Sequence, residues 1–101
     1  MSEHDLASQL KAIADPARLR ILRLLPQTDD CKHVYNVSEL AEEIGLSQPT
    51  VSHHLAVLRE AGLVNSRRMC RDVYYWLEPV ALQKLLDQVG GMCEPAGVQA
   101  K

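Results

Sequence analysis

Ser52, His53 and His54 are adjacent and are the first residues of this 101-residue chain to suggest chemistry. On a helix, about 100° separates neighbouring side chains, so the two histidines would point in different directions. They could not bind one metal ion together, because ligands on one helix need a spacing of three or four residues. No acidic residue is spaced to orient His53 as a base for Ser52. These residues therefore predict neither a metal site nor a catalytic site.

The three cysteines are widely and irregularly spaced. An odd number at such spacing does not indicate a disulfide framework, and free thiols are expected in a reducing compartment. Soft ions such as As(III), Cd(II) and Hg(II) prefer thiolate ligands. These thiols therefore suit a site for such an ion, or a thiol redox or persulfide switch. The candidate residues are Cys31, His33, Cys70 and Cys93.

The elements that would position these residues are mostly helical. Apolar residues make up 47% of the chain, and leucine recurs at helical spacing. The pattern predicts helices over residues 4–14, 16–25, 38–45, 48–61 and 79–90, a strand at 34–37, and a hairpin with strands at 63–69 and 73–78. This α-α-(β)-α-α-β-β-α order is typical of a mainly α, winged helix-turn-helix fold whose small β-hairpin is the wing. Residues 1–92 would form the domain and residues 93–101 a flexible tail.

The N-terminal ends of three helices and the inward face of the second can be predicted from individual residues. Asp15, Ser38 and Ser47 are expected to be N-caps, because short polar side chains can accept hydrogen bonds from the first free amides of a helix. The second helix is expected to turn Leu19, Leu22 and Leu25 inward.

The first and last helices each carry a long apolar stripe. The stripes comprise Leu6, Leu10 and Ile13 in the first, and Leu82, Leu85, Leu86 and Val89 in the last. They exceed what so small a core needs, which favours a homodimer joined through these helices.

The helix over 48–61 has two different faces. Val51, Leu55 and Leu58 are predicted to face the core, whereas His53 lies nearly opposite and His54 lies at the border, where a structural role is expected. The outward face is small and rich in hydrogen-bonding groups at its N-terminal end. Residues 47–75 also hold four arginines against two acidic residues. This favours a recognition helix in the major groove of DNA, flanked by arginines that hold phosphates, with no cofactor required. The predicted DNA-binding residues are Ser47, Gln48, Pro49, Thr50, Ser52, His53, Arg59, Arg67, Arg68 and Arg71.

Three segments together resemble the ArsR/SmtB family of bacterial winged-helix repressors: ADPARLRILRLL, VSELAEEIGLSQPTVSHHLAVLREAGLV and RRMCRDVYYWL. The resemblance spans residues 10–89, and its most specific parts are D-P-x-R-x-x-I-L and S-x-x-T-V-S-x-H-L. It implies a homodimer that binds a double-stranded DNA operator as a repressor and is released by an effector. Given the thiols, we expect this effector to be a thiophilic metal or metalloid, with As(III) favoured and a redox or persulfide signal as the alternative.

Two metal sites of that family have no counterpart in the sequence. The thiolate pair of the motif E-L-C-V-C-D-L falls on Asn36 and Ser38, and the last helix has Asp87 but no histidine. If residues 34–37 pair antiparallel with the second strand of the hairpin, Cys31 lies away from Cys70, and Cys93 is the better partner for Cys31.

Other classes of protein are disfavoured. The chain has neither a glycine-rich phosphate loop nor a paired acid–base constellation, so we do not expect an enzyme. No apolar run is long enough for a membrane span, and the N-terminus does not resemble a signal peptide, so we expect a cytoplasmic protein. A winged-helix module that binds proteins without an operator is the alternative function.

Overall fold

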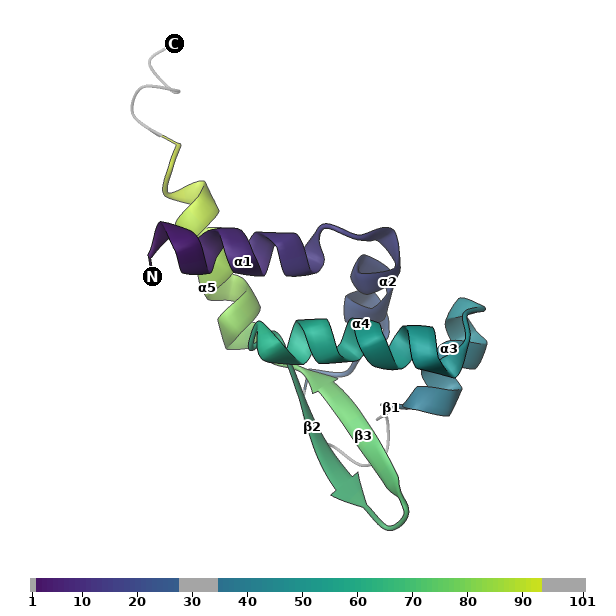
Figure 1. Cartoon of the computed structure of the whole chain (residues 1–101). Coiled ribbons are helices and arrows are strands. Elements are labelled where there is room, and N and C mark those ends of the chain that lie inside the picture. Colours follow the sequence, from purple (N-terminus) through teal and green to yellow (C-terminus); the bar gives the residue numbers. More distant parts are fainter. Residues whose placement is uncertain (1, 28–34, 94–101) are drawn as a thin grey trace.

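The computed structural model describes residues 2–27 and 35–93, and it confirms the predicted order of elements (Figure 1). The helices are α1 (Glu3–Ile13), α2 (Pro16–Leu24), α3 (Val37–Ile44), α4 (Gln48–Glu60) and α5 (Pro79–Gly90). The strands are β1 (Tyr35–Asn36), β2 (Val64–Met69) and β3 (Asp72–Leu77). None of the described helices is long and apolar enough to cross a membrane. The predicted tail lies outside the described residues except for Cys93.

The three strands form one antiparallel sheet in the order β1-β3-β2. Tyr35 pairs with Tyr75 on one edge of β3, and Ser66 pairs with Tyr75 on the other. The β2–β3 hairpin extends away from the helices as a wing (Figure 1). Its base is held by backbone hydrogen bonds: the Leu77 amide donates to the Pro26 carbonyl at 2.7 Å, and the Glu78 amide donates to the Leu63 carbonyl at 2.9 Å. The wing is therefore fixed to the ends of α2 and α4.

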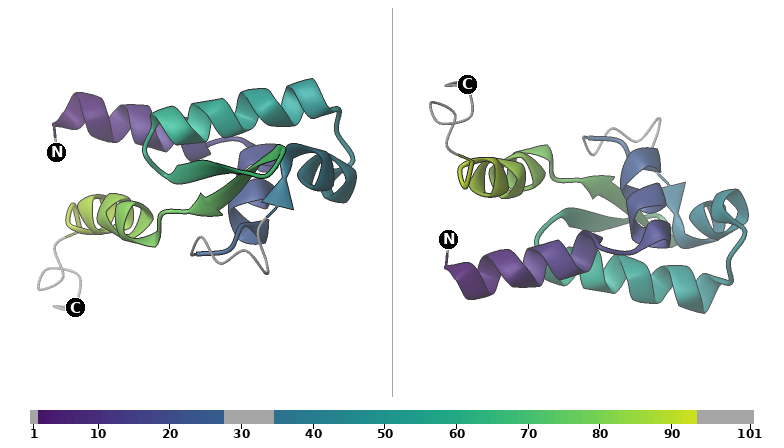
Figure 2. Two further views of the ribbon diagram at one scale, coloured as in Figure 1. Left: turned by 90° about the horizontal axis from the view of Figure 1, so that it is seen from below. Right: turned by 90° about the horizontal axis from the view of Figure 1, so that it is seen from above.

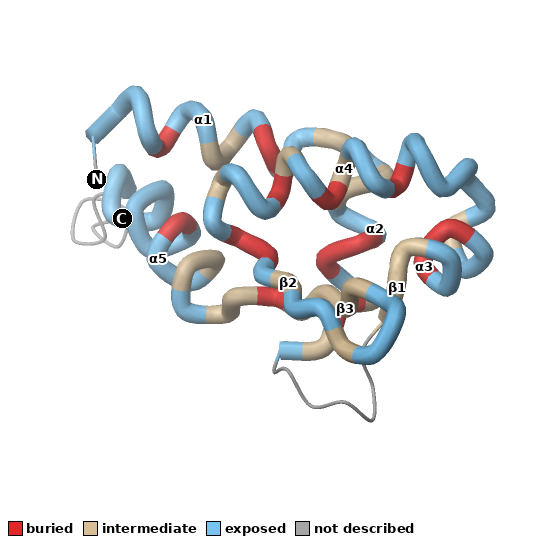
Figure 3. Tube along the Cα trace, turned by 60° about the horizontal axis from the view of Figure 1, so that its bottom comes forward, coloured by how far each residue is buried: buried red, intermediate tan, exposed pale blue. Residues whose placement is uncertain are grey.

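The core is aliphatic and is centred on α4. The three inward residues of α4 are buried, as predicted, and the core passes along the molecule from α1 and α5 to α3 (Figure 3). Helices α1 and α4 lie along one side, with α5, the sheet and α2 on the other (Figure 2). The side chain of Gln9 in α1 donates a 2.8 Å hydrogen bond to the carbonyl of Ala61, which caps α4. The largest fully buried side chains are Ile21, Leu40, Val51, Leu55, Leu58, Leu63 and Leu85.

Helices α3 and α4 form the predicted helix-turn-helix, joined by only three residues. The turn is possible because Gly45 adopts φ = 80°, a left-handed conformation that strains any residue with a Cβ. The Gly45 and Leu46 amides both donate to the carbonyl of Ala41, so the end of α3 is capped within the turn.

Three local predictions were wrong. Leu22 and Leu25 are buried as predicted, but Leu19 is 46% exposed and Ile21 takes its place in the core. The third helix is capped by Asn36 and not by Ser38, so the helix begins at Val37 and the strand ends one residue earlier than predicted. Asn36 forms a complete capping box: its Oδ1 accepts from the Glu39 amide at 2.8 Å, and the Glu39 Oε1 accepts from the Asn36 amide at 3.0 Å.

This cap gives a direct test of the local structure. Asn36→Ala is expected to reduce the free energy of unfolding by about 1 kcal/mol, because it removes an acceptor from the first turn of α3. Urea denaturation would measure the change. Ser38→Ala is the control, since the Ser38 side chain is exposed and does not cap the helix. An equal loss of stability in both variants would contradict the assignment of the cap.

Candidate DNA-binding surface

The N-terminal end of α4 is built by its cap. The Ser47 Oγ accepts a hydrogen bond from the Thr50 amide at 3.3 Å and lies 2.8 Å from the Thr50 hydroxyl. Pro49 occupies the first turn, where its missing N–H costs no hydrogen bond. The cap therefore engages two of the predicted DNA-binding hydroxyls with each other and satisfies the Thr50 amide, while the Val51 amide donates to the Ser47 carbonyl at 3.0 Å.

The faces of α4 match the prediction. Its inward residues are at most 1% exposed, whereas Gln48, Pro49, Ser52 and His53 are all exposed. The surface that α4 offers is polar, uncharged at its N-terminal half, and free of large side chains that would keep it out of a DNA groove. Such a surface can donate to and accept from base edges.

His54 faces the interior of the protein and not the outward surface. Arg18 Nη1 lies 3.4 Å from His54 Nδ1, and because a guanidinium only donates, this contact is a hydrogen bond when Nδ1 is unprotonated. The Nε2 lies 4.0 Å from the Asp15 carboxylate. The rings of His53 and His54 are tilted by 50° with centroids 5.9 Å apart, so they do not converge on a common ligand. His54 thus joins α4 to α2.

Asp15 both caps α2 and lies beside His54. Its carboxylate caps α2 by accepting from the Arg18 amide at 3.1 Å. That hydrogen bond lowers the pKa of the Asp15 carboxyl below its usual value, and the nearby His54 and Arg18 side chains lower the pKa further against an opposing effect of burial. The carboxylate therefore stays ionised beside the histidine.

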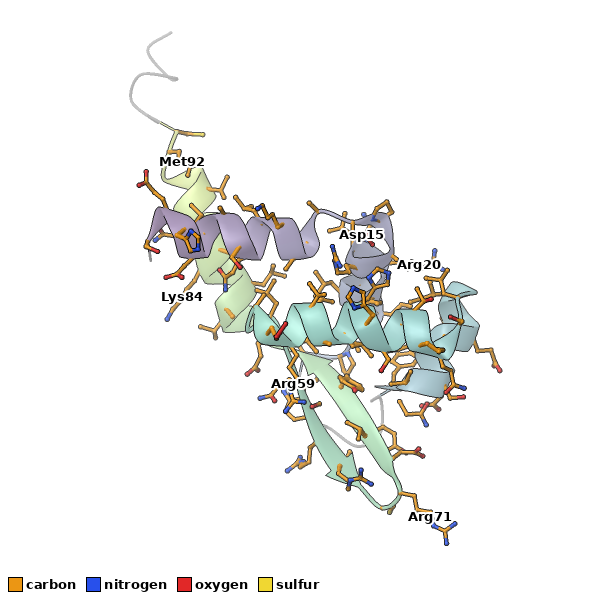
Figure 4. All side chains as sticks on the ribbon, viewed as in Figure 1. Asp15, Arg20, Arg59, Arg71, Lys84 and Met92 are labelled. Atoms are coloured by element: carbon orange, nitrogen blue, oxygen red, sulfur yellow. The ribbon has the colours of Figure 1, made fainter. Side chains whose placement is uncertain are left out.

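The wing presents its arginines in different directions. The register pairs Arg68 with Val73 and Arg67 with Tyr74, so the pleat places Arg67 and Arg68 on opposite faces of the hairpin. The Arg67 guanidinium lies 5.8 Å from the centre of the Trp76 ring, a cation–π contact. Arg71 lies in the turn at the wing tip, and Arg59 lies on α4 near the base of the wing (Figure 4). All ten predicted DNA-binding residues are exposed.

The predicted thiol site is only partly within the described residues. Cys31 and His33 lie outside them. Cys70 and Cys93 are exposed free cysteines, with Cys70 in the turn at the wing tip at φ = 58° and Cys93 just after α5. Their sequence neighbours Arg71, at the tip of the wing, and Met92, after α5, lie at opposite ends of the molecule (Figure 4). Within residues 2–27 and 35–93, no three His, Cys, Asp or Glu side chains are grouped to hold a metal ion.

One element of the surface could not be identified from the sequence. Tyr75 lines the space between α4 and the wing together with Ser52 and Arg59. The alternation along β3 gives some signal, since Val73, Tyr75 and Leu77 share a face and Leu77 belongs to the core. Its proximity to Ser52, however, depends on how the hairpin docks against α4.

Comparison with known proteins agrees with this arrangement. Residues 15–66 match the family described as bacterial regulatory protein, arsR family. The biofilm growth-associated repressor of Agrobacterium fabrum is 35% identical over 92 residues, which cover 90% of this chain and 74% of that protein.

Two solved structures resemble the fold. A possible transcriptional regulator for arsenical resistance superposes with a TM-score of 0.72 and 32% identity, covering 92% of this chain and 93% of that chain. The homodimeric winged helix-turn-helix DNA-binding domain of a possible regulator from Mycobacterium bovis superposes with a TM-score of 0.70 and 29% identity, covering 90% and 87%. The relatives are described as a repressor or as possible transcriptional regulators, which agrees with the class of protein that the sequence predicts. The chain belongs to the ArsR family of bacterial transcriptional regulators.

Proposed function

We propose that the protein represses transcription by binding operator DNA, with α4 in the major groove and the wing against the adjacent backbone. The observation that carries this proposal is the division of α4 into a fully buried apolar face and an exposed polar face. The buried face fixes the helix against the core, so the exposed face is held rigidly, as base recognition requires. The repressor named in Agrobacterium fabrum supports the direction of regulation.

We also propose that the DNA-binding form is a homodimer. Helix α5 exposes Leu86 (52%) and Val89 (37%) beside Leu85, which is buried against α1. Exposed apolar side chains along one helix favour association, and the related domain from Mycobacterium bovis is described as homodimeric. A two-fold dimer would meet a partly palindromic operator whose half-sites are one or more helical turns apart.

The wild-type protein should bind duplex DNA with an affinity that falls steeply as salt increases. Arg68→Ala and Arg71→Ala should each weaken binding to every sequence and reduce the salt slope by about one unit per lost phosphate contact. Arg67 lies on the opposite face of the wing, and Arg67→Ala should have the same two effects if that face also contacts DNA. Fluorescence anisotropy on a random-sequence duplex over a salt series measures both quantities.

The matched control is Lys84→Ala, which removes one positive charge from α5, far from the wing (Figure 4). It should leave the salt slope unchanged. Absence of any duplex binding by the wild type would favour a winged-helix module that binds protein partners. An equal effect of Lys84→Ala would mean that the net charge of the protein, and not the wing, sets the affinity.

For the effector, we propose a thiophilic ion, with As(III) favoured and Cys31 and Cys93 as the thiols that act together. The description of one similar structure as a possible regulator for arsenical resistance supports the choice of ion. Cys70 and Cys93 adjoin residues at opposite ends of the subunit, which leaves Cys31, with His33 nearby in sequence, as the partner for Cys93. Bridging the thiols would alter how the two copies of α4 are presented, and a coupling of about 1–3 kcal/mol is enough to release DNA.

This effector proposal predicts that As(III) releases the protein from DNA, and that Cys31→Ser and Cys93→Ser abolish the response while Cys70→Ser retains it. The response should weaken as pH falls, because thiolates must lose their protons to bind the ion. Anisotropy with As(III), Cd(II) and Hg(II) measures it for each variant. If Cys31→Ser or Cys93→Ser still leaves the DNA at the As(III) concentration that releases the wild-type protein, this site is refuted. Release by an oxidant or polysulfide alone, dependent on the same thiols, would establish the redox alternative.

A further inference from the structure

A seam runs between α4 and the wing, and polar side chains line it together with Leu55, Ala56, Val37 and Val73. It consists of two hollows of about 500 and 350 Å³ that adjoin, because both are lined by Ser52 and Tyr75. The larger hollow extends to Arg59 and Glu60, and the smaller one to Arg71 and Asp72. Each end of the seam therefore has one arginine and one carboxylate, and the middle has the two hydroxyl groups.

Tyr75 is held in this seam by its strand. It lies between Tyr35 and Ser66 in the sheet, and its ring packs against the core on the face of β3 that also carries the buried Leu77. Its hydroxyl has no hydrogen-bond partner within residues 2–27 and 35–93. The phenol is thus a fixed donor with unused capacity, placed between the recognition helix and the wing.

The geometry of duplex DNA indicates what occupies the seam. The major and minor grooves alternate, and a single sugar–phosphate strand separates one from the next. A protein that places α4 in the major groove and a wing at the neighbouring minor groove must therefore straddle that strand. The arginines at the two ends attract a polyanion, and the carboxylates beside them make the hydroxyl-lined middle the favoured position for a phosphate oxygen.

We propose that the Tyr75 hydroxyl donates a hydrogen bond to a phosphate of this sugar–phosphate strand, which the proposed DNA binding would lay along the seam between α4 and the wing. The inference rests on the proposed DNA binding and adds a positioning residue to it. Hydroxyl contacts to phosphate fix the register of a protein on DNA without reading its sequence. Tyr75 would therefore set how far α4 enters the groove while the wing remains in contact.

The test compares Tyr75→Phe with Tyr74→Phe in the full chain, on a fluorescein-labelled 30-bp random-sequence duplex. Tyr74 is the adjacent tyrosine on the opposite face of β3, where it pairs with Arg67. Tyr75→Phe keeps the ring and its packing and is expected to weaken binding about 10- to 100-fold, the loss of one hydrogen bond to a charged acceptor. Its salt slope should match the wild type, because a neutral hydroxyl displaces no counterion. Tyr74→Phe should bind as the wild type does.

The outcomes separate this inference from the function on which it rests. If the wild type does not bind the duplex, the proposed function fails. If the wild type binds and Tyr75→Phe binds equally well, only the phosphate contact is overturned. An equal loss of DNA affinity in Tyr74→Phe would overturn the phosphate contact, because the effect would then come from the sheet. A fall in the melting temperature of Tyr75→Phe large enough to explain its weaker binding would overturn the contact for the same reason. Unchanged DNA affinity with a changed As(III) response would mean that the seam holds the effector instead.

Discussion

Leu86→Gln is expected to weaken dimerisation by about 10- to 100-fold and to reduce operator binding in parallel. About half of the Leu86 side chain is exposed in the single subunit, and burying the whole of such a side chain is worth about 1.5–3 kcal/mol. In a two-fold dimer the substitution is present in both subunits, so the two half-exposed Leu86 side chains together bury about the area of one complete leucine side chain. Sedimentation equilibrium over a range of protein concentrations measures the dissociation constant.

Lys84→Gln is the control for this prediction, since it introduces the same side chain two residues earlier on α5. Positions 84 and 86 point about 160° apart around the helix, and Leu86 shares its face with Leu82 and Val89 at helical spacing, so Lys84 lies off the apolar stripe. Lys84→Gln should leave the dimer intact. If Leu86→Gln sediments as the wild type does at every concentration, α5 does not form the interface, and the exposed leucine has another explanation.

Gln48→Ala and His53→Ala are expected to reduce the preference for operator over random DNA by about 10-fold or more each. A side chain that pairs well with a base contributes about 1–3 kcal/mol of discrimination, and both residues are exposed on the face of α4 opposite the core. Binding to random duplex should change little, because phosphate contacts supply that affinity. An operator is obtained by selecting bound sequences from a random library with the wild-type protein, and competition binding then measures the ratio.

Arg68→Ala provides the contrast with these helix variants. It should lower affinity for operator and random DNA alike, so the ratio between them is retained. If the arginine substitution alters sequence preference and leaves the salt slope unchanged, the wing reads bases and the two roles have been assigned the wrong way round.

The sequence predicted the elements of this fold well because its patterns are local. The inward positions of α4 follow from helical periodicity, and all of them are buried. Gly45 marks the turn of the helix-turn-helix because a left-handed residue is needed there. Alternating residues and a polar turn similarly define the hairpin. Each of these features depends on a residue and its near neighbours, so one sequence is enough to find it.

The errors arise where a choice depends on distant parts of the chain. Ser38 and Asn36 are both good capping residues, and pairing of Asn36 with Tyr74 in the sheet starts the helix at Val37. Leu19 and Ile21 are similarly apolar, and the packing of α2 on the rest of the protein decides that Ile21 is buried.

The candidate site was predictable as a set of residues and not as an arrangement. Exposure of Gln48 and His53 follows from the helical wheel, but the opposite directions of Arg67 and Arg68 require the register of the hairpin. The position of Tyr75 beside Ser52 requires the docking of β3 against α4, which joins residues far apart in the sequence. Contacts of this kind leave no periodic signal in one sequence.

The hydrogen bond from Gln9 to the Ala61 carbonyl and the contact between Arg18 and His54 tie α4 to the first two helices at two points along its length. The recognition helix is therefore anchored to both α1 and α2 by side chains. In the proposed homodimer, a ligand that shifts α1 against the partner subunit would shift α4 as well, and so change the spacing of the two recognition helices. A fold with this linkage can acquire new signals by changing surface residues while its reading mechanism stays the same.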